Sequence, residues 1–176
     1  MDEPSHQTPR AYVGLGSNLG DRAGFLLLGL RGILHAGLSI ARLSSVYETA
    51  PVDVTDQPPF LNMVAELTGV LPAPEQLLAR LLRVEYALGR RRDAERPRGP
   101  RTLDLDLLLY GDVRHQTDFL TLPHPRLHLR RFALTPLVEL APDIEHPALG
   151  KTFSGLLAEL SDPETSVRLW QPRDKE

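Results

Sequence analysis

The stretch RTLDLDLLLYGD (residues 101–112) has the alternating pattern of a β-strand with one apolar face. Asp104 and Asp106 stand on the opposite face, where their Cβ atoms lie about 6–7 Å apart. Like charges at that distance repel each other, so this face requires a positive partner. The strand is therefore predicted to pack its apolar side on helices and to present both carboxylates to a cleft. The apolar side consists of Leu103, Leu105, Leu107 and Leu109.

The same periodicity places five elements ahead of this strand. They are strands at 11–17, 38–49 and 60–70, a helix at 22–36 and a helix from Pro74 to just before Gly89. This order is that of the split βαβ, ferredoxin-like fold. We therefore predict an α+β protein with a ferredoxin-like β-α-β-β-α-β core, whose helices lie on one face of a mainly antiparallel sheet. Additional C-terminal elements should follow: a short strand near 113–117, a helix from 130 and a helix near 153–160.

Length and composition indicate one globular domain, since the chain has 176 residues, of which 41% are apolar and 24% charged. We assign residues 11–165 to this domain and expect a disordered N-terminal tail at 1–10 and a C-terminal tail at 166–176. No apolar run approaches the roughly 20 residues of a membrane span, and the acidic N-terminus does not resemble a targeting signal. The absence of cysteine excludes disulfide and thiolate chemistry and favours a cytoplasmic location. The net charge of −3 argues against a general nucleic-acid binder.

Six arginines fall within GRRRDAERPRGPR (residues 89–101), directly before the acidic strand. Arginine binds phosphate through paired hydrogen bonds, and Mg²⁺ binds through one or two carboxylates while bridging substrate phosphates. A solvated arginine loop is an equally good reading of this segment taken alone. Because the arginines stand beside the acid pair, a metal–phosphate site is the better interpretation of the two features together.

Other motifs are less specific. GLGSNLG (residues 14–20) lacks the glycine spacing of a dinucleotide loop and the lysine of a Walker loop, so it is read as a tight turn. His124 and His128 are four positions apart, but a proline between them disfavours zinc, and a phosphate-contacting or loop-ordering role suits His124 better. Phe60 and Asn62 share one face of a predicted strand, where both could contact a planar heterocycle.

Several segments together resemble one enzyme family. They are GLGSNLGD, SSVYET, DQPPFLN, GPRTLDLDLLLYGD and LTLPHPRLHLRRFALTPLVELAPD, which occur in this order between residues 11 and 145. The chain is similar to the 6-hydroxymethyl-7,8-dihydropterin pyrophosphokinases of folate biosynthesis. The resemblance implies a ferredoxin-like fold and the transfer of pyrophosphate from ATP to the hydroxymethyl group of the pterin, with release of AMP.

The resemblance also implies roles for individual residues. The metal ligands would be Asp104 and Asp106, holding two Mg²⁺ ions, one between the α- and β-phosphates of ATP and one between the β- and γ-phosphates. Phe60 and Phe132 would sandwich the pterin, and Glu85 would orient the arginines. The pterin contacts would be Thr49, Val52, Phe60, Asn62 and Phe132. The ATP contacts would be Glu85, Arg92, Arg96, Arg101, Leu107, Thr121 and His124. The residues nearest the chemistry would be Arg90, Arg101 and Asp106.

Three positions depart from the family pattern. Pro97 and Arg98 stand where the family often has a tryptophan, with one extra residue, so the arginine loop must close differently. Phe60 replaces a usual tyrosine, and Pro125 stands where an aromatic residue is frequent. None of these changes touches the acid pair.

Two alternatives to this function are kept. The same scaffold could carry another Mg²⁺-dependent phospho- or nucleotidyl transferase with a different acceptor. It could also be a non-catalytic RNA-binding module, although such modules display aromatic residues where this chain has carboxylates. The expected partners are ATP and the pterin, with no nucleic acid and no membrane, and a monomer is favoured. Loops at 50–59 and 89–99 are expected to act as mobile lids.

Overall fold

The computed structural model describes residues 9–92, 97–161 and 166–172. Its centre is a six-stranded sheet in which every pairing is antiparallel. The strand order is β5-β1-β4-β3-β8, and β2 also pairs with β4. The strands are β1 (Ala11–Ser17), β2 (Ser39–Leu43), β3 (Tyr47–Thr49), β4 (Phe60–Thr68), β5 (Asp104–Tyr110) and β8 (Val167–Leu169).

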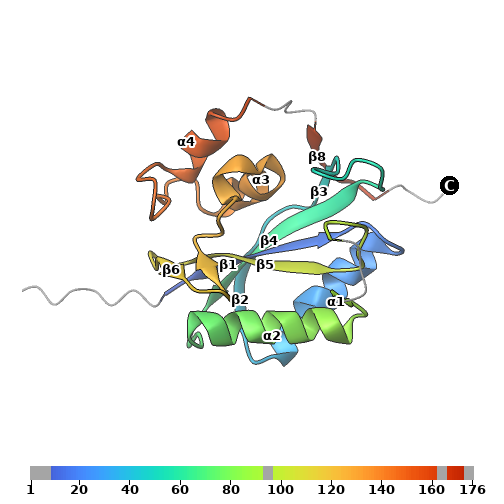
Figure 1. Cartoon of the computed structure of the whole chain (residues 1–176), viewed down its shortest axis with the longest axis horizontal. Coiled ribbons are helices and arrows are strands. Elements are labelled where there is room, and N and C mark those ends of the chain that lie inside the picture. The colour runs from blue at the N-terminus through green and yellow to red at the C-terminus, as the bar shows by residue number, and fades with distance from the viewer. Residues whose placement is uncertain (1–8, 93–96, 162–165, 173–176) are drawn as a thin grey trace, which may run out of the picture.

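Two long helices cover one face of this sheet, as Figure 1 shows. Helix α1 (Arg22–His35) begins at Asp21, whose carboxylate accepts a hydrogen bond from the Gly24 N–H at 2.9 Å. Helix α2 (Pro74–Ala87) begins with proline, which suits the first helical turn. Both helices pack on the main hydrophobic core, which also includes Leu103, Leu105 and Leu107. The predicted ferredoxin-like core is confirmed.

The other face of the sheet is covered only in part. Helices α3 (Arg131–Leu140) and α4 (Phe153–Ala158) pack there against Tyr12, Val64 and Leu108 (Figure 1). A two-stranded sheet of β6 (His115–Gln116) and β7 (Thr121–Leu122) and the 3₁₀ helix η1 (Leu127–Leu129) lead into α3. The additional C-terminal elements thus leave an opening beside β5.

Leu109 does not lie with the other leucines of β5, contrary to the predicted alternation. The register passes from Tyr12 opposite Leu109 to Val13 opposite Leu107, so Leu108 is an extra residue in the strand. A bulge of this kind turns the following side chain to the other face. Leu109 accordingly packs in the second core, with α3 and α4.

The single strand predicted at 38–49 is two strands, β2 and β3, separated at residues 44–46. Ser44 explains the break. Its N–H donates to the Val64 carbonyl at 2.9 Å, and its hydroxyl accepts from the Val64 N–H at 2.8 Å. Because a side chain takes the place of a backbone carbonyl, the regular ladder is interrupted there.

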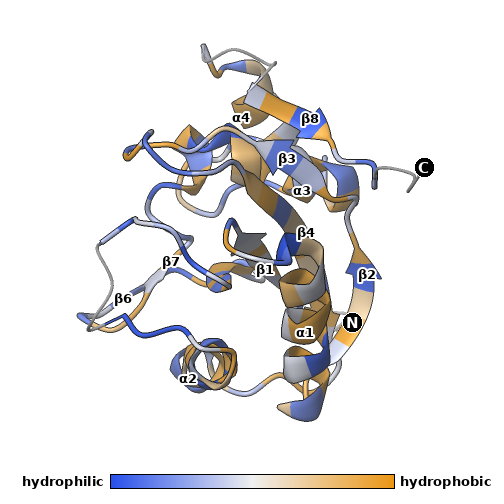
Figure 2. Cartoon of the chain, turned by 90° about the vertical axis from the view of Figure 1, so that its right-hand side faces the viewer, coloured by the Kyte–Doolittle hydropathy of each residue, from blue (hydrophilic) through white to orange (hydrophobic). Residues whose placement is uncertain are grey.

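The described residues outside the predicted domain, 9–10 and 166–172, include some that contact the sheet. Residues 167–169 form β8, which pairs with β3 at the sheet edge (Figure 2), so the assignment of 166–176 to a tail is wrong for this part. At the other end, residues 1–8 lie outside the described residues, but the Arg10 guanidinium is 3.0 Å from the buried Glu66 carboxylate. Within the described part of the chain, no helix has the length and apolar character needed to cross a membrane.

Candidate active site

A cleft opens on the sheet face that α3 and α4 leave uncovered. It lies between the ends of β1, β4 and β5, the loop at 50–59, the segment at 98–101 and the start of α3. Its empty space, open mouth included, is about 1050 Å³.

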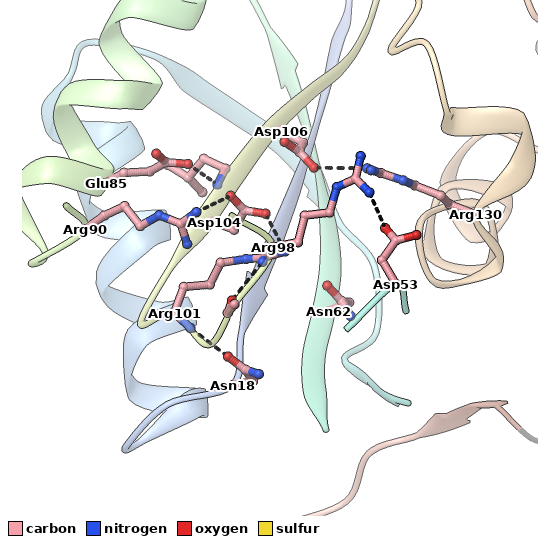
Figure 3. Close-up of polar contacts among 12 residues, drawn as sticks. Asn18, Asp53, Asn62, Glu85, Arg90, Arg98, Arg101, Asp104, Asp106 and Arg130 are labelled. Carbon is pink, nitrogen blue, oxygen red and sulfur yellow. Dashed lines mark hydrogen bonds and ion pairs between the residues drawn. The ribbon is translucent and has the colours of Figure 1, made fainter. Parts of the chain in front are cut away.

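Asp104 and Asp106 both line this cleft from β5 (Figure 3). The alternation of the strand produces this placement, since the intervening Leu105 is buried in the core at 1% exposure. The residues of β1 opposite the two acids are Gly16 and Gly14. A Cβ atom on Gly16 would lie 2.7 Å from the Asn62 side-chain oxygen, so glycine keeps the floor of the cleft clear.

Three arginines surround the Asp104 carboxylate. The distances are 3.1 Å to Arg101, 3.4 Å to Arg92 and 3.9 Å to Arg90. Glu85 holds Arg92 in place through two hydrogen bonds of 2.8 and 2.9 Å and accepts the Leu105 N–H at 2.7 Å. Glu85 therefore lies behind the cleft, where burial raises the pKa of its carboxyl group.

The Asp106 carboxylate has less positive charge around it. Arg130 is 3.7 Å away, and the Asp106 side chain is 32% exposed. Burial in the cleft, followed by the negative charge of Asp104, raises the pKa of Asp106 to about 7. A cation placed between the two acids would relieve this repulsion and favour the ionised form.

The opposite wall of the cleft carries two aromatic rings and a side-chain amide. Phe60 at the start of β4 and Phe132 in α3 both line it. The Asn62 amide donates to the Thr49 hydroxyl at 2.7 Å, which leaves its carbonyl oxygen directed at the cleft beside Gly16. The Arg101 guanidinium lies 4.8 Å from the centre of the Phe60 ring. This wall can receive a flat, polar ring.

Most of the predicted site residues line this one cleft. They are Thr49, Val52, Phe60, Asn62, Arg90, Arg92, Arg101, Asp104, Asp106, His124 and Phe132. His124 is held by hydrogen bonds to neighbouring backbone groups, and burial together with Arg130 lowers its pKa to about 4.

Three predicted residues do not line this cleft, and a fourth lies outside the described residues. Leu107 packs in the main core and is 3% exposed. Thr121, in β7, lines a second cleft that shares His124 with the first. Glu85 lies behind the cleft and contacts Arg92 and the Leu105 N–H, and Arg96 lies outside the described residues.

Sequence reasoning missed several residues that shape the cleft. Arg130, Asp53, Gln57 and Arg98 line it, and Asn18 joins two of its loops. Asn18 and Arg130 fall within motifs that carried the family resemblance, which was the available signal. Asp53 stands in a loop without periodicity, and no local pattern marks it.

Comparisons with known proteins agree with this arrangement. The family model for 7,8-dihydro-6-hydroxymethylpterin-pyrophosphokinase (HPPK) matches residues 12–142. The 2-amino-4-hydroxy-6-hydroxymethyldihydropteridine pyrophosphokinase of Bacillus subtilis is 38% identical over 164 residues, covering 93% of this chain and 91% of the relative. The enzyme of the same name from Aquifex aeolicus is 40% identical over 141 residues, covering 80% and 85%.

Longer relatives contain a similar region. The folate synthesis bifunctional protein of Pisum sativum is 42% identical over 152 residues, but this chain spans only 29% of its length. The crystal structure of wild-type Plasmodium falciparum HPPK-DHPS with pteroate matches this chain with a TM-score of 0.68 at 15% sequence identity. The match covers 89% of this chain and 43% of that chain. At that identity the likeness shows the fold alone. The match of the family model and the two bacterial relatives shows that the chain belongs to the 7,8-dihydro-6-hydroxymethylpterin-pyrophosphokinase family.

Proposed function

We propose that this chain transfers pyrophosphate from ATP to the hydroxymethyl group of 6-hydroxymethyl-7,8-dihydropterin, releasing AMP, in folate biosynthesis. Membership of the family supports this activity. The observation that carries it is a single cleft that combines two carboxylates and three arginines with an aromatic and amide wall. Such a cleft brings a polyphosphate and a flat heterocycle together.

The acid pair fits Mg²⁺. Among the described residues no group of three or more His, Cys, Asp or Glu could hold a metal ion, so a cation here takes its remaining ligands from water and phosphate. Mg²⁺ is commonly bound in this way. Asp104 and Asp106 would hold two such ions, which supply charge neutralisation at the phosphates when bound.

The arginines that contact Asp104 are placed so that they can exchange its carboxylate for a phosphate group as their hydrogen-bond partner. In the ligand-free cleft Arg92 and Arg101 contact Asp104. Once a cation neutralises Asp104, their guanidinium groups are free to bind phosphate oxygens as paired donors. Arg90 and Arg101 would stand nearest the transferred group. Arg96 keeps its predicted role in phosphate binding, and Thr121, His124 and Leu107 keep theirs as ATP contacts.

The heterocycle is held by the opposite wall. Phe60 and Phe132 would stack on its two faces, while Asn62, Thr49 and Val52 would read its polar edge. This fixes the hydroxymethyl oxygen near Asp106 and in line with the β-phosphorus. Positioning and charge stabilisation account for most of the catalysis of phosphoryl-type transfer.

Neither alternative function is favoured by the family comparisons. The face that an RNA-binding module would line with aromatic residues here carries Asp104 and Asp106. A cytoplasmic location, a monomeric state and the absence of nucleic-acid partners stay predictions, as does the single domain at 11–165.

Replacing Asp106 by alanine tests this proposal. We expect calorimetry to show that Mg²⁺ no longer strengthens the binding of a non-hydrolysable ATP analogue, and AMP release with the pterin to fall by on the order of 10³-fold, because charge stabilisation at the reacting group is lost. The matched control is Asp143→Ala, which removes an exposed carboxylate outside the cleft. Unchanged turnover in Asp106→Ala would rule out the metal role, and AMP release with another acceptor alone would rule out the pterin.

A further inference from the structure

Asp53 joins three segments that are far apart in the sequence. Its carboxylate accepts two hydrogen bonds from the Arg126 guanidinium, at 3.0 and 3.1 Å. Arg98 approaches the same carboxylate at 3.6 Å (Figure 3). We name these contacts the Asp53 latch. They connect the loop at 50–59 with the arginine segment and with the turn before α3, across the mouth of the cleft.

The backbone at the latch is unusual. Asp53 has a φ of 68° and Arg98 a φ of 59°, and they are the two non-glycine residues with positive φ in the described part of the chain. This conformation is unfavourable for residues with a side chain, although aspartate and asparagine tolerate it best. Such residues persist where surrounding contacts hold them, which is common at functional sites. Here both belong to one ion pair.

The base of the same loop is fixed by a different kind of contact. The buried Asn18 amide donates to the Gln57 side chain and to the Pro58 carbonyl, both at 3.0 Å, and its oxygen accepts the Arg101 N–H at 2.8 Å. Gln57 in turn donates to the Arg98 carbonyl at 3.0 Å. The base is therefore held by neutral, partly buried or exposed hydrogen bonds. The tip has neutral hydrogen bonds at Val54, and Asp53 adds charged contacts to Arg126 and Arg98.

We propose that Asp53 is a positioning residue for the heterocyclic substrate. Its latch holds the tip of the 50–59 loop over the cleft before any ligand binds, so that Thr49 and Val52 already stand where they meet the edge of the ring. The proposal rests on the function given above. A loop ordered in advance removes part of the entropy cost of binding, which strengthens affinity without a new contact.

The latch has a limited strength because it is partly exposed. The exposed fractions of the side chains are 29% for Asp53, 33% for Arg126 and 62% for Arg98. Partly exposed pairs of this kind are weak and are screened by salt. The Arg126 hydrogen bonds lower the pKa of Asp53, so the carboxylate is ionised at neutral pH. The dihydropterin carries no net charge at that pH, so salt should act on its affinity mainly through the latch.

Two variants separate charge from backbone conformation. Asp53→Asn keeps a side chain that tolerates positive φ and removes the charge. Asp56→Asn is the matched control. It removes a charge from the same loop at an exposed residue for which the described residues offer no hydrogen bond or ion pair.

The experiment measures loop exchange and two affinities. In ligand-free protein, backbone hydrogen exchange of residues 50–59 should quicken in Asp53→Asn and stay at the parent rate in Asp56→Asn. By calorimetry the dissociation constant of the pterin, measured with a saturating ATP analogue, should rise about fivefold in Asp53→Asn. The affinity of the ATP analogue should change less than twofold. Raising salt from about 0.05 to 0.5 M should weaken pterin binding in the parent but not in Asp53→Asn.

Unchanged loop exchange in Asp53→Asn would overturn the proposal, and so would an equal loss of pterin and ATP affinity. A fivefold loss of pterin affinity in Asp56→Asn as well would show that the effect comes from the net charge of the loop. This result would also overturn the proposal. The exchange measurement needs no substrate. If the parent bound no pterin, the proposed function would fail on its own while the latch was still judged by exchange.

Discussion

Asp104 and Asp106 show how two identical side chains on one strand differ in their surroundings. Asp104 has three described arginines within 3.9 Å, whereas the ion pair described for Asp106 is with Arg130 at 3.7 Å. Burial and the neighbouring Asp104 therefore raise the pKa of Asp106 to about 7. A divalent cation placed between the two carboxylates would relieve this repulsion and favour ionised Asp106.

His124 predicts a pH dependence of stability. Burial and then Arg130 hold its folded pKa at about 4, below the unfolded value of about 6.5. Between these values the unfolded chain binds more protons than the folded protein, so stability falls as the pH is lowered. We expect the loss in unfolding free energy between pH 7.5 and pH 5, measured with urea, to be smaller in His124→Asn by on the order of 1 to 2 kcal/mol. The same loss in parent and variant would contradict this prediction.

Helices α1 and α2 must lie close together for the arginines to be placed correctly. Gly32 in α1 meets Val84 in α2, and a Cβ atom on Gly32 would lie 2.4 Å from a Val84 methyl carbon. The next residue of α2 is Glu85, which holds Arg92 toward Asp104. The small residue in α1 therefore sets the position of the phosphate-facing side chains one helix away.

Gly32→Ala is expected to destabilise the protein. Alanine is the better helix former by about 1 kcal/mol, but the overlap with Val84 should cost more, giving a net loss of about 1–2 kcal/mol in the free energy of unfolding. Chemical denaturation measures this change. The double variant Gly32→Ala/Val84→Ala supplies the control, because removing the valine methyls makes room and should recover part of the loss. A Gly32→Ala protein more stable than the parent would show that α2 moves freely.

Strand β8 supports one wall of the cleft from outside the cleft. Strand β8 pairs with β3, and its neighbours extend the contact: the Ser166 carbonyl accepts the Ala50 N–H and the Val46 carbonyl accepts the Trp170 N–H, both at 2.9 Å. Ala50 begins the loop that carries the Asp53 latch. The last strand thus supports, from the far end of the sequence, the part of the cleft that meets the heterocycle.

Removing residues 166–176 should therefore affect both stability and substrate binding. Loss of the Trp170 packing and of the strand hydrogen bonds should lower the free energy of unfolding by about 2–4 kcal/mol. Pterin affinity should fall with it, as measured by calorimetry on the folded fraction. Removing residues 171–176 alone keeps β8 and Trp170 and should change neither quantity. If the two truncations behaved alike, β8 would have no part in the site.

Features that depend on neighbours along the chain could be predicted from the amino-acid sequence. The periodicity of apolar residues and the residue types at the helix ends identified both core helices, and periodicity identified β5. The alternation of β5 placed Asp104 and Asp106 together on the face opposite the core leucines. Recognisable motifs then indicated site residues, most of which line the cleft. These features are local because side-chain direction repeats every two residues in a strand and about every 3.6 in a helix.

Contacts between segments that are far apart in the sequence became visible only in the folded chain. The break at Ser44 and the pairing of β8 depend on partners that lie 20 or about 120 positions away, and so does the meeting of Asp53 with Arg126, 73 positions apart. No local pattern records such contacts, because their free energy arises when packing of the core brings loops together. The acids of the cleft could thus be read from the sequence, whereas the latch that spans its mouth required the fold.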